Sequence, residues 1–214
     1  MIMHTTFYSY IRLLLLIGFF LGISAASAAS PARVLVLGDS ISAAYGMSLD
    51  QGWVALMEEE LNKQGATEAV INASISGETT AGALRRLPAL LEEHQPTLVV
   101  VELGGNDGLR GHPIPSLREN LRDIVTSSQE AGARVLILPM EIPPNYGSRY
   151  LEAFRESFIL ISESTGASLG SFPLLDAATR PELMQADGIH PTVEAQPIIA
   201  ERVLPEVLEA LTQP

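Results

Sequence analysis

The feature that most constrains the fold is an alternation of short apolar runs with amphipathic stretches. Four runs rich in valine, isoleucine and leucine are predicted to be strands buried on both faces: Arg33–Leu37, Ala69–Asn72, Leu98–Leu103 and Val135–Leu138. Ala167–Phe172 is a weaker fifth run. Between the runs, apolar residues recur at helical spacing within four segments: 53–61, 84–91, 151–161 and 199–207. Strands separated by helices predict an α/β fold, a three-layer sandwich with helices on both faces of a parallel sheet.

Proline inside the last helical segment is unfavourable for a continuous helix. Pro205 has no backbone N–H, and its ring clashes with the preceding turn. The sequence therefore predicts either a kink at Pro205 or two shorter helical pieces.

The first 28 residues have the pattern of a cleaved signal peptide. Arg12 precedes an apolar run at Leu13–Ile23, which only glycine interrupts, and the small residues Ala26–Ala28 follow at the spacing of a cleavage site. The alternative is a transmembrane anchor, but about 11 apolar residues fall short of the ~20 that a bilayer span needs. We predict a periplasmic or secreted protein without a stable membrane anchor, whose mature part is residues 29–214.

Length, cysteine content and charge limit the remaining possibilities. A chain of 214 residues is long enough for one domain and too short for two ordinary ones. It has no cysteine, which excludes a lipid-anchored N-terminal cysteine and leaves the core to hold the fold without disulfides. The net charge of −12 argues against nucleic acid and anionic membrane surfaces as partners. We expect a monomer or a weak oligomer.

Polar segments that contain glycine follow each of the first three predicted strands. They are Gly38–Ser40, Ser74–Thr79 and Gly104–Gly108. Parallel strands bring their carboxyl ends to one edge of the sheet, and ligands of such folds bind at that edge. The sequence therefore predicts that these three segments converge on one site.

A serine, a histidine and an aspartate together form a candidate nucleophilic set. Ser40 follows the first strand, although a lone serine there is more often a helix cap. Position 42 is Ser42, so the Gly-x-Ser-x-Gly elbow of α/β-hydrolases is absent. Asp187 lies three residues before His190, with Gly188 permitting a tight turn between them. A serine hydroxyl needs an imidazole base and an acid that orients it, so these residues predict a catalytic triad.

The other histidines have ordinary structural explanations. His94 closes a predicted helix, where the helix dipole favours it, and His112 lies just past the third glycine-rich segment. The Asp187 and His190 pair is a weak metal site, because no further histidine or cysteine cluster has ligand spacing. No metal is expected.

Acyl transfer also needs donors for the oxygen that becomes negative in the tetrahedral intermediate. Three candidates follow the strands: the backbone N–H groups of Ser40 and Gly77, and the side-chain amide of Asn106. Gly77 and Asn106 could each be ordinary turn residues. Their predicted convergence with Ser40 at one edge favours an oxyanion hole.

Four segments carry a family resemblance: Gly38–Ser42, Asn72–Thr79, Glu102–Gly111 and Asp187–Pro191. They resemble the four conserved blocks of the SGNH (GDSL) hydrolases, and the nearest group is the bacterial periplasmic thioesterase I, lysophospholipase and arylesterase type. The family name has leucine where this chain has Ile41, a conservative change at a packing position.

The resemblance implies a fold, a mechanism and substrates. The fold is a five-stranded parallel sheet of flavodoxin-like order, without a metal or other cofactor. Ser40 would be the nucleophile, His190 the base and Asp187 its orienting acid, and Ser40, Gly77 and Asn106 would form the oxyanion hole. The expected substrates are small esters, thioesters and lipids, namely aryl esters, acyl-CoA and lysophospholipids, which are cleaved through an acyl-enzyme.

Two other functions stay open at this point. One is acyl transfer to another acceptor or O-deacetylation of glycans, since relatives of the family include carbohydrate deacetylases. The other is a non-catalytic binding domain, which would be expected to lose the serine, the histidine or the oxyanion donors. Four apolar residues are candidate walls for the acyl chain, or equally loop packing: Leu109, Ile114, Ile142 and Tyr146.

Overall fold

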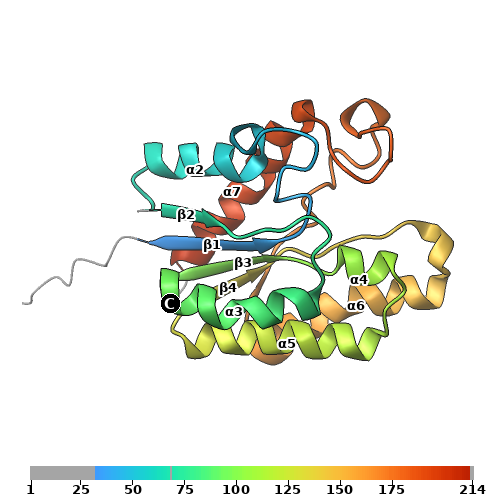
Figure 1. Ribbon diagram of the computed structural model, residues 1–214, viewed down its shortest axis with the longest axis horizontal. Coiled ribbons are helices and arrows are strands. Elements are labelled where there is room, and N and C mark those ends of the chain that lie inside the picture. Colours follow the sequence, from blue (N-terminus) through green and yellow to red (C-terminus); the bar gives the residue numbers. More distant parts are fainter. Residues whose placement is uncertain (1–31, 68, 213–214) are drawn as a thin grey trace, which may run out of the picture. The chain divides into compact units, whose positions relative to one another are not determined.

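The computed structural model describes residues 32–67 and 69–212, so the predicted signal peptide at 1–28 lies outside the described residues. Five parallel strands form one sheet in the order β2-β1-β3-β4-β5 (Figure 1). The strands are β1 (Arg33–Gly38), β2 (Ala69–Asn72), β3 (Leu98–Glu102), β4 (Arg134–Ile137) and β5 (Ser168–Leu169). This is the flavodoxin-like order, and the predicted fold class is confirmed.

Helices cover both faces of the sheet. The α-helices are α2 (Trp53–Lys63), α3 (Thr80–His94), α4 (Gly105–Leu109), α5 (Ile114–Glu130), α6 (Ser148–Thr165) and α7 (Gln196–Thr212). Short 3₁₀ helices are η1 (Leu49–Gln51), η2 (Pro144–Tyr146), η3 (Pro181–Leu183) and η4 (Val193–Ala195). Figure 1 shows α2 and α7 on one face of the sheet, with α3, α5 and α6 on the other.

Two helices differ from the sequence-based expectation. The predicted helical segments omit α5, although its buried residues Leu117, Leu121 and Ile124 have helical spacing. Pro205 lies inside α7, which runs without interruption from Gln196 to Thr212, so of the two alternatives, a kink or two shorter pieces, the second is wrong.

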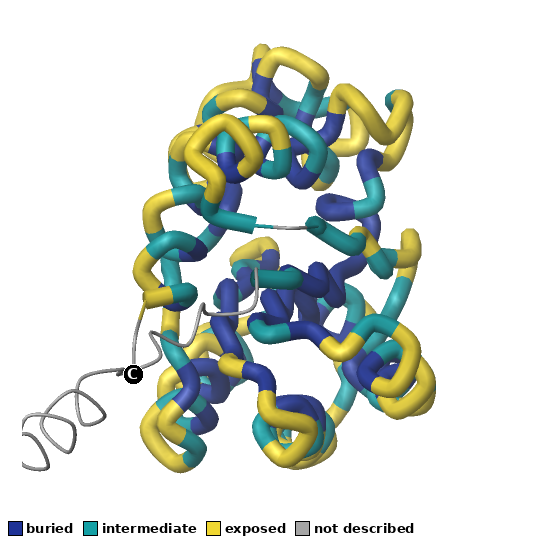
Figure 2. The backbone as a smooth tube through the Cα atoms, turned by 90° about the vertical axis from the view of Figure 1, so that its left-hand side faces the viewer, coloured by how far each residue is buried: buried dark blue, intermediate teal, exposed yellow. Residues whose placement is uncertain are grey.

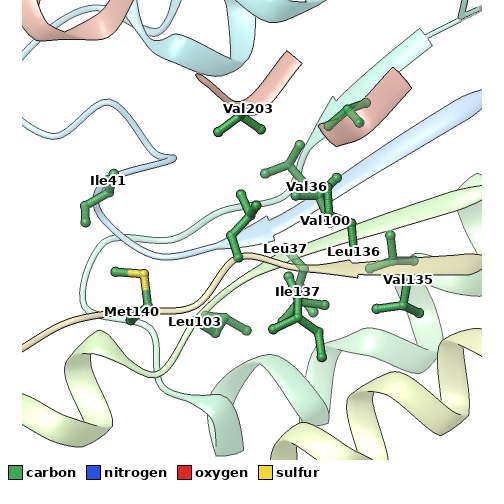
Figure 3. Packing of buried hydrophobic residues seen from close by; sticks show 14 of the residues in the cluster. Val36, Leu37, Ile41, Val100, Leu103, Val135, Leu136, Ile137, Met140 and Val203 are labelled. Atoms are coloured by element: carbon green, nitrogen blue, oxygen red, sulfur yellow. The ribbon is translucent and has the colours of Figure 1, made fainter. Parts of the chain in front are cut away.

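The core lies between the strands and the two helical layers. Figure 2 shows the buried backbone concentrated there, with the outer sides of the helices exposed. Val36 of β1 pairs with Val100 of β3, which pairs with Leu136 of β4, so matching residues line up across the sheet. Val203 of α7 packs near these strands (Figure 3). Each such buried side chain contributes about 1.5–3 kcal/mol to folding, so the sheet is a rigid base for the loops at its edge.

The turn after β3 needs a glycine. Gly104 has φ +109°, in the left-handed region, and a Cβ at this position would lie 3.1 Å from Cζ of Phe158 on α6. The chain can therefore turn sharply from β3 into α4, whose second residue is Asn106. None of the helices within 32–67 and 69–212 is long and apolar enough to span a membrane.

Candidate active site

Ser40, His190 and Asp187 lie in a hydrogen-bonded chain at the carboxyl edge of the sheet. His190 Nε2 is 2.8 Å from Ser40 Oγ, and His190 Nδ1 is 2.7 Å from Asp187 Oδ2. A carboxylate only accepts hydrogen bonds, so the proton of the neutral ring lies on Nδ1. Nε2 is then free to accept the hydrogen of the Ser40 hydroxyl. This is the arrangement that a general base requires.

The tight turn around Gly188 holds the Asp187 carboxylate in place. Asp187 Oδ1 accepts the backbone N–H groups of Ile189 at 2.9 Å and His190 at 3.0 Å, while Oδ2 faces the imidazole. Gly188 has φ +66°, which glycine adopts without strain. Hydrogen bonds from the backbone and side chain of His190 lower the pKa of Asp187 to about 2. The carboxylate therefore stays charged at neutral pH.

A buried carboxyl group lies behind the turn that carries Ser40. Glu102, the last residue of β3, is 0 % exposed, and its Oε2 accepts the Ser42 hydroxyl at 2.7 Å and the Asp39 backbone N–H at 3.3 Å. Burial, together with the nearby Asp39 carboxylate, raises the pKa of Glu102 well above its ordinary value. Glu102 therefore connects the end of β3 to both sides of Ser40.

Gly38 makes room for this contact. A Cβ on Gly38 would lie 2.7 Å from the Ser42 side chain and 2.8 Å from Glu102 Oε2. The glycine in front of Asp39 and Ser40 is therefore required by the close approach of Glu102 to the turn. Its φ lies outside the left-handed region, so space and not backbone freedom is the reason for it.

Asn106 is oriented by Asp39. Asn106 Nδ2 donates to Asp39 Oδ2 over 3.1 Å, and the backbone N–H of Ile41 donates to Asp39 Oδ1 over 3.1 Å. Burial raises the pKa of Asp39 to about 6. The amide nitrogen of Asn106 has a second hydrogen, which remains available to a ligand.

Gly77 lies in the loop after β2, with φ +78°. Its carbonyl oxygen accepts Arg110 Nη2 at 2.9 Å, so the segment after α4 contacts the loop after β2. Ser40, Asn106 and His190 line one cavity of about 560 Å³, whereas Gly77 is not among the residues that line it.

The cavity is mostly apolar, and it includes only half of the predicted acyl-chain walls. Leu109 and Ile142 line it, whereas Ile114 and Tyr146 line a separate surface hollow beside α6. Tyr146 Oη donates to the Leu109 carbonyl oxygen at 2.6 Å. Further apolar residues of the cavity were not among the predicted walls, and they include Met140, Phe172, Leu174 and Met184.

No role was predicted from the sequence for four polar or aromatic residues around Ser40 and His190: Asp39, Tyr45, Glu102 and Gln185. Asp39 and Glu102 are acidic residues at the ends of apolar strands, and an acidic residue at that position could have indicated a site residue. Tyr45 and Gln185 lie in loops without a recognisable pattern. His94 ends α3 as predicted, and His112 Nδ1 is 3.6 Å from Asp107 Oδ1.

The fold and the site together define a class of protein. Serine hydrolases have a serine, a histidine and an aspartate hydrogen-bonded in series, and here these residues lie at the carboxyl edge of a parallel sheet. A family model confirms and sharpens this class: residues 36–197 match the GDSL-like Lipase/Acylhydrolase family. The chain belongs to this family.

Known proteins of high similarity agree with this assignment. The chain is 47 % identical over 194 residues to esterase TesA of Pseudomonas aeruginosa, covering 91 % of this chain and 96 % of that protein. It is 44 % identical over 174 residues to thioesterase 1/protease 1/lysophospholipase L1 of Escherichia coli K12, covering 81 % of this chain and 82 % of that protein. Among solved structures, the crystal structure of the psychrotrophic esterase EstA from Pseudoalteromonas sp., inhibited by monoethylphosphonate, matches with a TM-score of 0.82 and 46 % identity. The match covers 85 % of this chain and 100 % of the EstA chain.

Proposed function

We propose that this protein hydrolyses carboxylic esters and acyl thioesters through an acyl-enzyme on Ser40. The observation that carries the proposal is the series of contacts from Ser40 Oγ to His190 Nε2, at 2.8 Å, and from His190 Nδ1 to Asp187 Oδ2, at 2.7 Å. The names of the similar proteins, an esterase and a thioesterase/lysophospholipase, support the substrate class.

In the acylation step, Ser40 Oγ attacks the carbonyl carbon of the substrate. Its proton moves to His190 Nε2, and the carbonyl π electrons move to the oxygen, which becomes negative. The Asp187 carboxylate stabilises the imidazolium that forms. Collapse of the intermediate breaks the bond to the alkoxide or thiolate leaving group, and this group takes up the proton from His190.

Three donors are proposed to stabilise the oxyanion: the backbone N–H groups of Ser40 and Gly77, and the Asn106 amide. Each donor acts on charge that develops only in the transition state, so it lowers the barrier without tightening substrate binding. Asp39 holds the Asn106 amide in its orientation before the substrate arrives. In the deacylation step, His190 removes a proton from water, and the water oxygen attacks the acyl carbonyl carbon. Collapse of this second intermediate breaks the bond to Ser40 Oγ, which takes the proton back from His190, and the acid is released.

The acyl part of the substrate is proposed to lie in the cavity beside Ser40. A volume of about 560 Å³ is within the usual range for small-molecule sites, and the walls include Leu109, Ile142 and Phe172. Apolar walls favour an aliphatic or aromatic acyl group. We also propose, from the sequence of residues 1–28, that the enzyme is exported and acts in the periplasm or outside the cell.

Turnover of p-nitrophenyl esters of increasing acyl length tests the proposal. The wild-type protein should hydrolyse them, and Ser40→Ala should abolish turnover and labelling by an organophosphonate while the fold stays intact. Ser164→Ala, on α6 and outside the cavity, is the matched serine control and should retain both. Labelling at another serine, with activity retained in Ser40→Ala, would refute the proposal.

A further inference from the structure

The imidazole of His190 packs against an aromatic ring from the nucleophile segment. The ring centroids of Tyr45 and His190 are 4.2 Å apart, and their planes are tilted by 33°. Tyr45 lies five residues after Ser40, and its backbone N–H donates to the Ser40 carbonyl oxygen at 3.1 Å. Tyr45 is 48 % exposed, so burial in the core does not account for the position of its ring.

The backbone around Tyr45 is unusual. Ala44 has φ +55° and Gly46 has φ +81°, so left-handed residues lie on both sides of Tyr45. A positive φ is unfavourable for alanine, and such conformations persist where the surrounding structure enforces them, often next to functional sites. Here the conformation places the Tyr45 ring against His190.

Gln185 connects the same two loops through hydrogen bonds. Its Nε2 donates to the carbonyl oxygens of Tyr45 at 2.9 Å and Pro191 at 3.0 Å, and its backbone N–H donates to the His190 carbonyl oxygen at 2.7 Å. A Cβ on Gly46 would lie 2.9 Å from Gln185 Oε1, so glycine permits this approach. One amide therefore joins the segment after Ser40 to the turn that carries His190.

We propose that Tyr45 and Gln185 are positioning residues that hold the imidazole of His190 in register with Ser40. This proposal rests on the proposed function, because it assigns them a role in the same reaction. Neither residue lines the cavity beside Ser40, so they act through His190 and not on the substrate.

The physical need for such support lies in the exposure of the histidine loop. Asp187, Gly188 and Ile189 are all exposed, whereas Ser40 lies in a buried segment. A base must stay within about 2.6–3.2 Å of its nucleophile, and a loop at the surface does not guarantee that distance. Gln185 anchors the loop to the nucleophile segment, while the Tyr45 ring limits rotation of the imidazole. The face of the Tyr45 ring also attracts the imidazolium that forms during acylation.

The experiment compares variants in steady-state hydrolysis of p-nitrophenyl butyrate and in the rate of organophosphonate labelling of Ser40. Tyr45→Leu and Gln185→Met should each lower kcat about 10-fold, since small misplacements of a catalytic group are costly. KM should change less than about 2-fold, because ground-state binding is untouched. Tyr45→Phe keeps the ring and should stay within about 2-fold of wild type. The control Leu49→Ala, an exposed residue four positions further along, should be unchanged.

A double variant tests whether the two residues act as one unit. Tyr45→Leu combined with Gln185→Met should be little worse than either change alone, because residues that act together show non-additive losses. Two results would overturn the proposal. One is a wild-type kcat in both single variants, and the other is a kcat of Tyr45→Phe that is as low as that of Tyr45→Leu. Circular dichroism of each variant checks folding. If Tyr45→Leu does not fold, the kcat of Gln185→Met alone tests the proposal. If the wild-type protein neither hydrolysed the ester nor became labelled, the proposed function itself would be wrong. If the wild-type protein is active and the variants are equally active, only the positioning role of Tyr45 and Gln185 would be wrong.

Discussion

Asp39 Oδ2 accepts a hydrogen bond from Asn106 Nδ2 over 3.1 Å, across the gap between the ends of β1 and β3. Asp39 is the residue directly before Ser40, so one short segment supplies the proposed nucleophile and orients the proposed oxyanion donor. Glu102 is bonded to the same segment from behind, through the Asp39 N–H and the Ser42 hydroxyl. Glu102 ends β3, while Ser40 and Asn106 lie in the segments that directly follow the adjacent strands β1 and β3.

The first prediction concerns Asn106. Asn106→Ala should lower kcat ~100-fold or more, roughly 3 kcal/mol of transition-state stabilisation, with a much smaller change in KM. Steady-state kinetics on a p-nitrophenyl ester measure both. Asn120→Ala is the matched control, because Asn120 donates to Thr80 and does not line the cavity. A normal kcat with a raised KM would mean that Asn106 binds substrate instead.

The second prediction concerns pH and the buried Glu102. A buried acid with a raised pKa keeps its proton in the folded state while the unfolded chain loses it, so its contribution to stability is full below the ordinary pKa of glutamate, about 4.3. This contribution falls as pH rises, by at most about 1.4 kcal/mol per pH unit for one group. Glu102→Gln should therefore become less destabilising relative to wild type as pH rises from about 4.5 to 7.

Urea unfolding of both proteins at several pH values measures this difference. Glu59→Gln, at an exposed position on α2, is the control and should show no such trend. A difference between Glu102→Gln and wild type that is constant with pH would contradict a raised pKa for Glu102.

The third prediction concerns the hydrogen-bonded pair of Asp187 and His190. Hydrogen bonds from the turn and the imidazole lower the pKa of Asp187 to about 2, so the stability that the carboxylate contributes is present above its ordinary pKa and is lost only as pH falls toward 2. Asp187→Asn removes the titrating group, so the difference in unfolding free energy between wild type and Asp187→Asn should shrink as pH falls toward 2. Urea unfolding of both proteins at several acidic pH values measures this difference, and a difference that is constant with pH would contradict a lowered pKa for Asp187.

The fourth prediction concerns the same pair in catalysis. Asp187→Asn should keep the fold and lose activity on the order of 10³-fold or more, because an amide neither stabilises the imidazolium nor fixes its tautomer. His190→Ala should be at least as damaging. The double variant should be little worse than His190→Ala, since the two residues act as one unit. Losses that multiply in the double variant would show that they act independently.

The fifth prediction concerns export. Mass spectrometry of protein from the cell envelope should find a mature N-terminus close to Ala29, because Ala26–Ala28 has the small residues that a cleavage site needs. Ala28→Tyr, which replaces the small residue directly before the expected cleavage point, should retain the leader. An intact Met1 on membrane-bound wild-type protein would contradict a cleaved signal peptide.

The layers and the edge of the sheet were predictable because strong local patterns encode them. Val34–Leu37 and Leu98–Val101 are runs of residues buried on both faces, and such runs have few alternatives to a parallel sheet under helices. The weaker pattern at β5 predicted too long a strand: six residues were expected, and only Ser168–Leu169 pair with β4. The helix α5 was omitted although its spacing was visible.

The sequence by itself determined that Ser40 and Asn106 belong near one edge, because each follows a strand, and that Asp187 and His190 share one tight turn. Only the tertiary structure decided what supports them. Glu102 and Ser42 are 60 residues apart, and Gln185 and Tyr45 are 140 apart, so no local spacing relates them. It also separated Leu109 and Ile142 from Ile114 and Tyr146, which line different hollows. Side-chain contacts across loops depend on how whole elements pack, and a linear pattern does not encode that packing.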